Sequence, residues 1–166
     1  MLDIGCGSLR AGRLLIVYLR PERYCGIEPQ RWLVTSAIRS EVGRDLIQLK
    51  RPAFDHGQDF RFTVFDRTFD FLLASSIFSH AAQAQIETCL SEARAVMKPS
   101  SILLASFVPG SANYDGDSWT YPATVSYTLE RMRELAAKHR LDVETIDWPY
   151  VFGANRQVWL AFSPRR

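Results

Sequence analysis

The sequence has few cysteines and no long apolar run, and each of these absences excludes a class of protein. Its three cysteines are an odd number and lack the spacing of a disulfide framework or of a four-ligand metal site. We therefore expect free thiols in a reducing compartment and no bound metal. The longest apolar stretches, such as residues 69–74 and 102–105, are far shorter than the ~20 residues that a membrane-spanning helix needs, so no membrane partner is expected.

The sequence also lacks an excess of charge of one sign. Its 166 residues carry a net charge of +2, and Lys and Arg are scattered along the chain, so electrostatics indicates no nucleic-acid partner. No charged-then-apolar leader opens the chain, which predicts a cytoplasmic protein. The length and the hydrophobic fraction of 47% suit one globular domain over residues 1–166.

What the sequence does contain is an alternation of short apolar segments and amphipathic ones. This alternation predicts a doubly wound α/β fold, with a mostly parallel seven-stranded sheet and helices on both faces. A short connection around residues 149–155 brings an antiparallel strand to one edge. The first strand begins at Met1, so we expect it to be truncated. The expected strands are 1–4, 23–27, 51–55, 69–74, 101–108, 141–147 and 156–162, and the expected helices are 10–19, 31–42, 82–97 and 125–139.

The clearest chemical signal is a glycine-rich turn after the first strand, the run LDIGCGS at residues 2–8. Glycines let the backbone turn sharply and approach a ligand that a Cβ would exclude, and the amides of the following helix favour polar or negative ligand groups. Glu28 stands at the end of the second strand, where a carboxylate can accept both hydroxyls of a ribose. Together these features predict a site for a nucleoside cofactor.

Four segments in order resemble those of class I S-adenosylmethionine (SAM)-dependent methyltransferases. The run at 2–8 resembles the first motif of the family, and YCGIEP at 24–29 resembles the second. FDFLLAS at 69–75 is similar to the fourth strand, and VMKP followed by ILL within 96–104 is similar to the turn and strand that come next. The resemblance covers nearly the whole chain and implies a SAM-dependent methyltransferase, with S-adenosylhomocysteine as the product.

Matched by position, the resemblance also implies where the cofactor binds. Asp3 and the glycine turn line the methionine part of SAM, and Glu28 holds the ribose. Asp59 approaches the adenine amino group, with Asp55 and Asp66 as alternatives for that role. The side chains after the fourth strand lie beside the cofactor. The full implied set is Asp3, Gly5, Cys6, Gly7, Ser8, Arg10, Glu28, Pro29, Asp59, Ser75, Ser76 and Ile77.

Three features depart from the family pattern. Ser8 replaces the usual third glycine and Gly12 comes later, so we expect a wider loop. Arg10 either pairs with the cofactor carboxylate or a substrate anion, or lies on the solvated helix surface. Because nothing precedes the first strand, we expect a cofactor site that is open, or one that another chain completes.

The residues after the fourth strand disfavour two classes of acceptor. ASSI at 74–77 is not the Asp/Asn-Pro-Pro-aromatic pattern of exocyclic-amine DNA methylation, and no Pro-Cys nucleophile follows. His80 is the candidate catalytic base, because histidine titrates near neutral pH. Alternatively, Ser79 and His80 simply begin the next helix, with Ser79 as its N-cap.

Three aromatic residues lie in a turn-rich insertion at 109–124, after the fifth strand. Tyr114, Trp119 and Tyr121 either form an acceptor pocket or pack the insertion onto the domain. We expect the acceptor to be a small molecule, or a metabolite or sugar hydroxyl.

Two other functions compete with this prediction. One is a SAM-fold module that binds without methylating, as a scaffold or as the partner of an active subunit. The other is an NAD-dependent dehydrogenase, which is disfavoured because Arg10 takes the place of the third small residue of Gly-x-Gly-x-x-Gly. The oligomeric state is not indicated.

Overall fold

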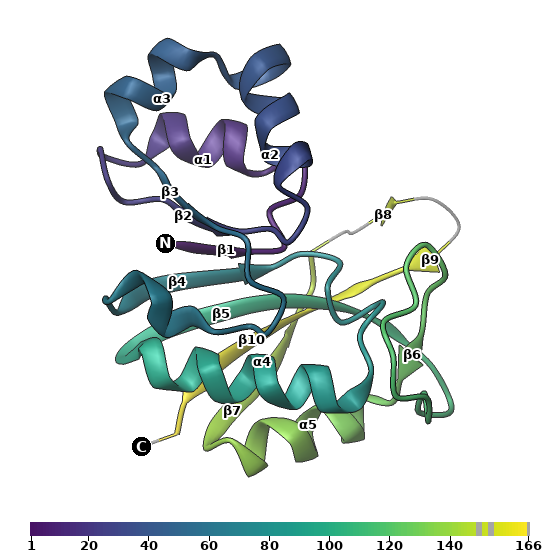
Figure 1. The fold of residues 1–166 in the computed structure, drawn as a ribbon. Helices are drawn as coiled ribbons and strands as arrows, with labels where there is room; N and C mark the ends of the chain where they lie inside the picture. Colours follow the sequence, from purple (N-terminus) through teal and green to yellow (C-terminus); the bar gives the residue numbers. More distant parts are fainter. Residues whose placement is uncertain (149–150, 153–154, 166) are drawn as a thin grey trace.

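A mixed sheet with the strand order β3-β2-β1-β4-β5-β10-β7 forms the centre of the molecule (Figure 1). The computed structural model describes residues 1–148, 151–152 and 155–165. The first five strands pair in parallel, whereas β10 pairs antiparallel with both β5 and β7. The predicted mostly parallel sheet with antiparallel pairing near one edge is confirmed. The strands are β1 Leu2–Ile4, β2 Cys25–Ile27, β3 Ala53–Asp55, β4 Phe69–Ala74, β5 Met97–Pro109, β7 Leu141–Ile146 and β10 Val158–Pro164.

Helices cover the sheet from two sides (Figure 1). α1 Gly12–Tyr18, α2 Arg31–Ala37 and α3 Arg44–Lys50 lie over β1, β2 and β3, while α4 Gln83–Val96 and α5 Leu129–Lys138 lie on the opposite face. The buried side chains of α4 recur every three or four residues, as expected for a helix with one face packed against the sheet. No helix among the described residues has the length and apolar character to cross a membrane.

The segment predicted as one helix over 31–42 is divided in the structure. α2 ends at Ala37, a π-helical turn follows at Ile38–Val42, and α3 is a separate helix. Gly43 explains the division, because its φ of 87° lies in a region that favours glycine and that a continuing helix does not use.

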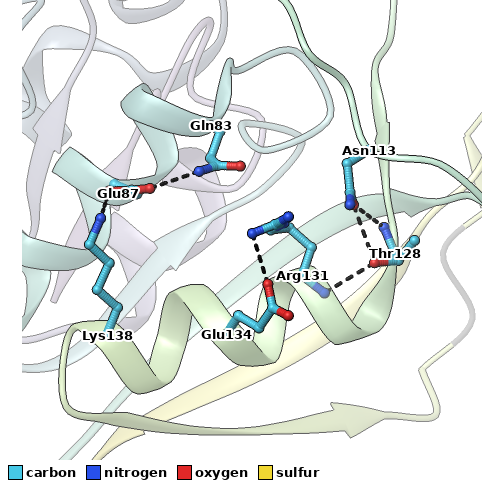
Figure 2. Close-up of polar contacts among 7 residues, drawn as sticks. All are labelled: Gln83, Glu87, Asn113, Thr128, Arg131, Glu134 and Lys138. Atoms are coloured by element: carbon cyan, nitrogen blue, oxygen red, sulfur yellow. Dashed lines mark hydrogen bonds and ion pairs between the residues drawn. The ribbon is translucent and has the colours of Figure 1, made fainter.

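The predicted helix over 125–139 is wrong at its start. Ser126–Tyr127 forms a short strand, β6, that pairs in parallel with the end of β5, and α5 begins only after Thr128. Thr128 Oγ1 accepts the backbone N–H of Arg131 at 3.1 Å and so caps the helix, while Asn113 Oδ1 accepts the N–H of Thr128 at 2.9 Å (Figure 2). Helix α5 is further joined to α4 by an ion pair between Lys138 and Glu87 (Figure 2).

The predicted connection at 149–155 lies partly outside the described residues. Within it, β8 Val151–Phe152 pairs antiparallel with β9 Asn155–Arg156. The remaining predicted elements are present, with ends that differ by a few residues.

Candidate functional site at the carboxyl edge of the sheet

Parallel strands direct their carboxyl ends to one edge of the sheet, and the glycine turn and Glu28 meet there. The loop after β1 is held against the end of β2, because the Cys6 N–H donates to the Ile27 carbonyl at 2.9 Å. The Gly7 N–H donates to Oε2 of Glu28 at 3.0 Å. The glycine turn and Glu28 are therefore in direct contact, although 21 positions separate them.

The two glycines of this loop both have a positive φ, but their surroundings differ. Gly5 and Gly7 have φ values of 67° and 51°, where a side chain is strained. A Cβ on Gly5 would collide with the side chain of Ile77, so that position is closed. A Cβ on Gly7 would come no nearer than 4.0 Å to another atom, so its backbone borders open space.

Glu28 is held in a fixed position by several backbone groups. Its side chain is buried, with the residue 8% exposed, and Oε1 accepts the N–H of Gln30 at 2.9 Å. Its own N–H donates to the Asp55 carbonyl, which ties it to the end of β3. Each carboxylate oxygen has more than one lone pair, so each retains capacity for a ligand hydroxyl.

His56 was not predicted to belong to this site, yet it lies beside Glu28. Its Nδ1 is 2.7 Å from the Glu28 carbonyl oxygen. A carbonyl oxygen only accepts, so this nitrogen carries the proton and donates. The sequence signal was its position directly after β3, at the same sheet edge as Glu28.

Asp3 and Tyr24 form a buried pair beneath the glycine loop. The Tyr24 hydroxyl donates to Oδ2 of Asp3 at 2.6 Å. Burial raises the pKa of Asp3 to about 6, although the hydrogen bond from Tyr24 opposes this rise. A Cβ on Gly12 would lie 2.7 Å from the Tyr24 oxygen, so this later glycine makes room for the pair. Tyr24 was not predicted as a site residue.

The carboxylates considered for the adenine side occupy the loop after β3. Asp55 Oδ2 accepts the Gly57 N–H at 2.8 Å, and Asp59 Oδ1 lies near the same glycine, 3.1 Å from where its Cβ would be. Asp59 is exposed, with Arg61 4.0 Å away. Asp66 follows the 3-10 turn Phe62–Phe65, further along the chain.

Ser76 and Ser79 interact with each other after β4. Their hydroxyl oxygens are 3.1 Å apart. The prediction that Ser79 caps the next helix is wrong, because α4 begins at Gln83 and its N-cap position is Ala82. The Ala82 N–H instead donates to the side chain of Gln85.

His80 is buried against the insertion. Its Nδ1 is 2.7 Å from the Ala123 carbonyl oxygen, so Nδ1 carries the proton and Nε2 keeps its basic lone pair in the neutral ring. The ring centroids of Trp119 and Tyr121 lie 5.6 and 5.1 Å from that of His80. Tyr114 packs against the hydrophobic core.

A family model described as a methyltransferase domain matches residues 2–103. The chain belongs to the methyltransferase domain family. The match begins at β1 and extends into β5, so it contains the glycine turn, Glu28 and the residues after β4. The predicted class I SAM-dependent methyltransferase is confirmed by this match.

Solved structures share the fold of this methyltransferase domain. A SAM-dependent methyltransferase from Clostridium acetobutylicum ATCC 824 superposes with a TM-score of 0.71 at 11% identity, over 99% of this chain and 83% of that one. Magnesium protoporphyrin IX methyltransferase from Synechocystis PCC 6803, with bound SAM, gives 0.73 at 13% identity, over 98% and 68%. A protein described as a pericyclic reaction enzyme gives 0.68 at 18% identity, over 99% and 42%.

The three cysteines of this methyltransferase domain are free thiols. Cys6, Cys25 and Cys89 are all buried. Burial raises the pKa of each thiol, so these side chains are poor nucleophiles near neutral pH. Within the described residues, no group of three or more His, Cys, Asp or Glu side chains is arranged to hold a metal ion.

Proposed function

We propose that this methyltransferase domain binds SAM at the glycine turn and methylates a hydroxyl group of a small molecule, with His80 as the base. The observation that carries the proposal is the Gly7–Glu28 contact beside open space. A glycine that leaves room for a ligand, next to a fixed and buried carboxylate, suits the amino acid and ribose parts of a nucleoside cofactor.

The residues present fit SAM by their chemistry. Asp3 and the glycine turn would line the methionine part, with Arg10 near its carboxylate, and Glu28 would accept the two ribose hydroxyls. Asp59, or Asp55 from the same loop, would accept from the adenine amino group. When bound, SAM supplies an electrophilic methyl group. The remaining proposed contacts are Cys6, Ser8, Pro29, Ser75, Ser76 and Ile77.

His80 supports a hydroxyl acceptor, because an alcohol must lose its proton on methylation. With Nδ1 donating to Ala123, Nε2 is the atom that would take this proton. The rings of Trp119 and Tyr121 would exclude water and contact an apolar part of the acceptor. The free, buried thiols suit a reducing compartment, and we place this single-domain activity in the cytoplasm.

A second candidate function is a domain that binds SAM without methylating. This second function is supported by the structural similarity to a protein described as a pericyclic reaction enzyme, because that similarity shows that the fold is not restricted to methyl transfer. The two functions differ in turnover, since only a methyltransferase releases S-adenosylhomocysteine when an acceptor is supplied.

Cofactor binding is tested by thermal unfolding with SAM, S-adenosylhomocysteine and NAD. A ligand at 100 times its Kd adds about 2.7 kcal/mol of stability, or several degrees in Tm. We expect this rise with the first two ligands in the wild type and in Glu22→Ala, an exposed matched control, and its loss in Glu28→Ala. A rise with NAD alone would contradict the proposal.

Catalysis is tested by S-adenosylhomocysteine release with a panel of small alcohols, phenols and sugars. His80→Gln should lower kcat by about 10²–10⁴-fold, as expected for loss of a general base, and should leave SAM binding intact. His139→Gln, a substitution at the C-cap of α5, should retain activity. Wild type that binds SAM but releases no product with any acceptor would favour the second candidate function.

A further inference from the structure

A buried polar network joins three separate segments at the carboxyl edge of the sheet. Its members are Ser76 and Ser79 after β4, Ser106 in β5 and Gln157 immediately before β10. Ser79 and Ser106 are fully buried and Gln157 is 7% exposed, so the hydrogen bond between Ser106 and Gln157 is shielded from water, whereas Ser76 is partly buried.

The hydrogen bonds of this network close on themselves. Ser106 Oγ accepts the N–H of Ser76 at 2.8 Å and donates to Oε1 of Gln157 at 2.7 Å. Gln157 Nε2 then donates to Ser76 Oγ at 2.9 Å. Each of the three residues contacts the other two, so removing the Ser106 hydroxyl leaves the Ser76 N–H without its acceptor and Gln157 Oε1 without its donor.

The network holds a backbone conformation that a non-glycine residue adopts at a cost. Ser76 has a φ of 61°, and its N–H is fixed by Ser106. The next residue, Ile77, covers Gly5, and the Ser79 carbonyl accepts the N–H of Val125 at 2.8 Å. The conformation of Ser76 therefore sets how the loop after β4 meets both the glycine turn and the insertion.

We propose that Gln157 and Ser106 are positioning residues: through Ser76 they hold the loop that carries Ile77 against the glycine turn and His80 against the insertion. This inference rests on the proposed function, because it assigns the loop to the cofactor and acceptor site. It gives Gln157 a part in the site, although this residue lies beyond the residues matched by the family model.

The chain contains a closely matched control for Ser106. Ser101 lies on the same strand and is also fully buried. Its Oγ accepts a backbone N–H, from Lys98 at 2.8 Å, and donates to an oxygen, the Phe69 carbonyl at 2.6 Å. The two serines thus lose equivalent contacts on mutation, but Ser101 is at the opposite edge of the sheet.

The experiment compares Ser106→Ala with Ser101→Ala, and adds Gln157→Met as a second way to open the network. Thermal unfolding, amide hydrogen exchange and the Kd of S-adenosylhomocysteine are measured for each. We expect similar losses of Tm for the two serine variants. Exchange should accelerate across 75–80 in Ser106→Ala and Gln157→Met only, and their Kd should rise about tenfold, equivalent to 1.4 kcal/mol, while Ser101→Ala binds as the wild type does.

Equal Kd values for Ser106→Ala and Ser101→Ala, with binding by the wild type, would overturn the positioning role and leave the proposed function standing. Absence of binding by the wild type would instead overturn the proposed function. In that case the exchange data still decide whether the network orders the loop, because unchanged exchange at 75–80 in Ser106→Ala and Gln157→Met would overturn the inference by itself.

Discussion

The two halves of the sheet differ in how much structure supports them. β1, β2 and β3 have three residues each, and the helices above them have seven each. On the other side, β5 has thirteen residues and α4 has fourteen. Most of the larger hydrophobic cluster lies in this second half, between the long strands and α4 and α5, although it also includes Leu2 and Ile4 of β1 and Cys25 and Ile27 of β2. The glycine turn and Glu28 therefore lie on the half with the shorter elements, next to the half with the longer ones.

The largest expected effect is in the half with the longer elements. Phe162 of β10 is fully buried and packs edge-on against Phe78, so Phe162→Ala should cost about 3–5 kcal/mol in the free energy of unfolding. Phe71, on β4 of the same sheet, is 55% exposed. Phe71→Ala is therefore the matched control, and urea unfolding should show a much smaller loss. Equal losses would contradict the assigned position of the core.

The next largest effect is expected at Asp3 of β1, where a buried carboxylate lowers the stability of the domain at neutral pH. Burial raises the pKa of Asp3 from 3.8 to about 6, so its stabilising contribution is present below pH 4 and is lost as the pH rises through 6. The difference corresponds to about 3 kcal/mol.

Asp3→Asn should remove this pH dependence and make the domain more stable than the wild type at pH 7 to 8. Urea unfolding of both proteins from pH 4 to 8 checks the sign, and the gain should grow between pH 4 and 6. A gain that does not grow with pH would show that the buried charge is not its cause. Weaker binding of S-adenosylhomocysteine by the more stable variant would indicate that the carboxylate is retained for function.

A smaller effect is expected where the glycine loop meets α1. Gly12→Ala would bring a methyl group within 2.7 Å of the Tyr24 oxygen and within 2.9 Å of Leu9. Overpacking of this kind costs typically about 1–3 kcal/mol. Amide exchange should then accelerate around β1 and β2 before it does in β5. A uniform change across the sheet would contradict the distinction between the halves.

The smallest effect is expected at the surface between α4 and α5. Lys138 pairs with Glu87, and its hydrogen bond lowers the pKa of that carboxyl. Lys138→Met should cost no more than about 1 kcal/mol, and the cost should shrink at high salt. Thermal unfolding at two salt concentrations measures this, and a salt-independent loss would point to packing rather than charge.

Sequence reasoning located the parts of the site that depend on local pattern. The glycine turn, Glu28 and the strand–helix alternation were all predicted, because each follows from residue type and spacing along a short segment. The short strand β6 was missed, since a two-residue strand is defined by its partner, β5, and not by its own sequence.

The contacts within the site required the structure. The Asp3–Tyr24 pair joins neighbouring strands, and nothing in either segment alone indicates it. The alternative that Ser79 caps the next helix rested on its position before an amphipathic run, where a serine usually has that role. Its partner Ser76 is instead bound by Gln157, which is 81 positions away in the sequence.

Amide hydrogen exchange with and without S-adenosylhomocysteine is the most direct test of the central claim, that the cofactor binds at the carboxyl edge of the half with the shorter elements. We expect the ligand to protect residues 5–8, 28–30 and 75–80, and to leave residues 97–101 at the opposite edge unchanged. Protection confined to other segments, or no protection at saturating ligand, would contradict it.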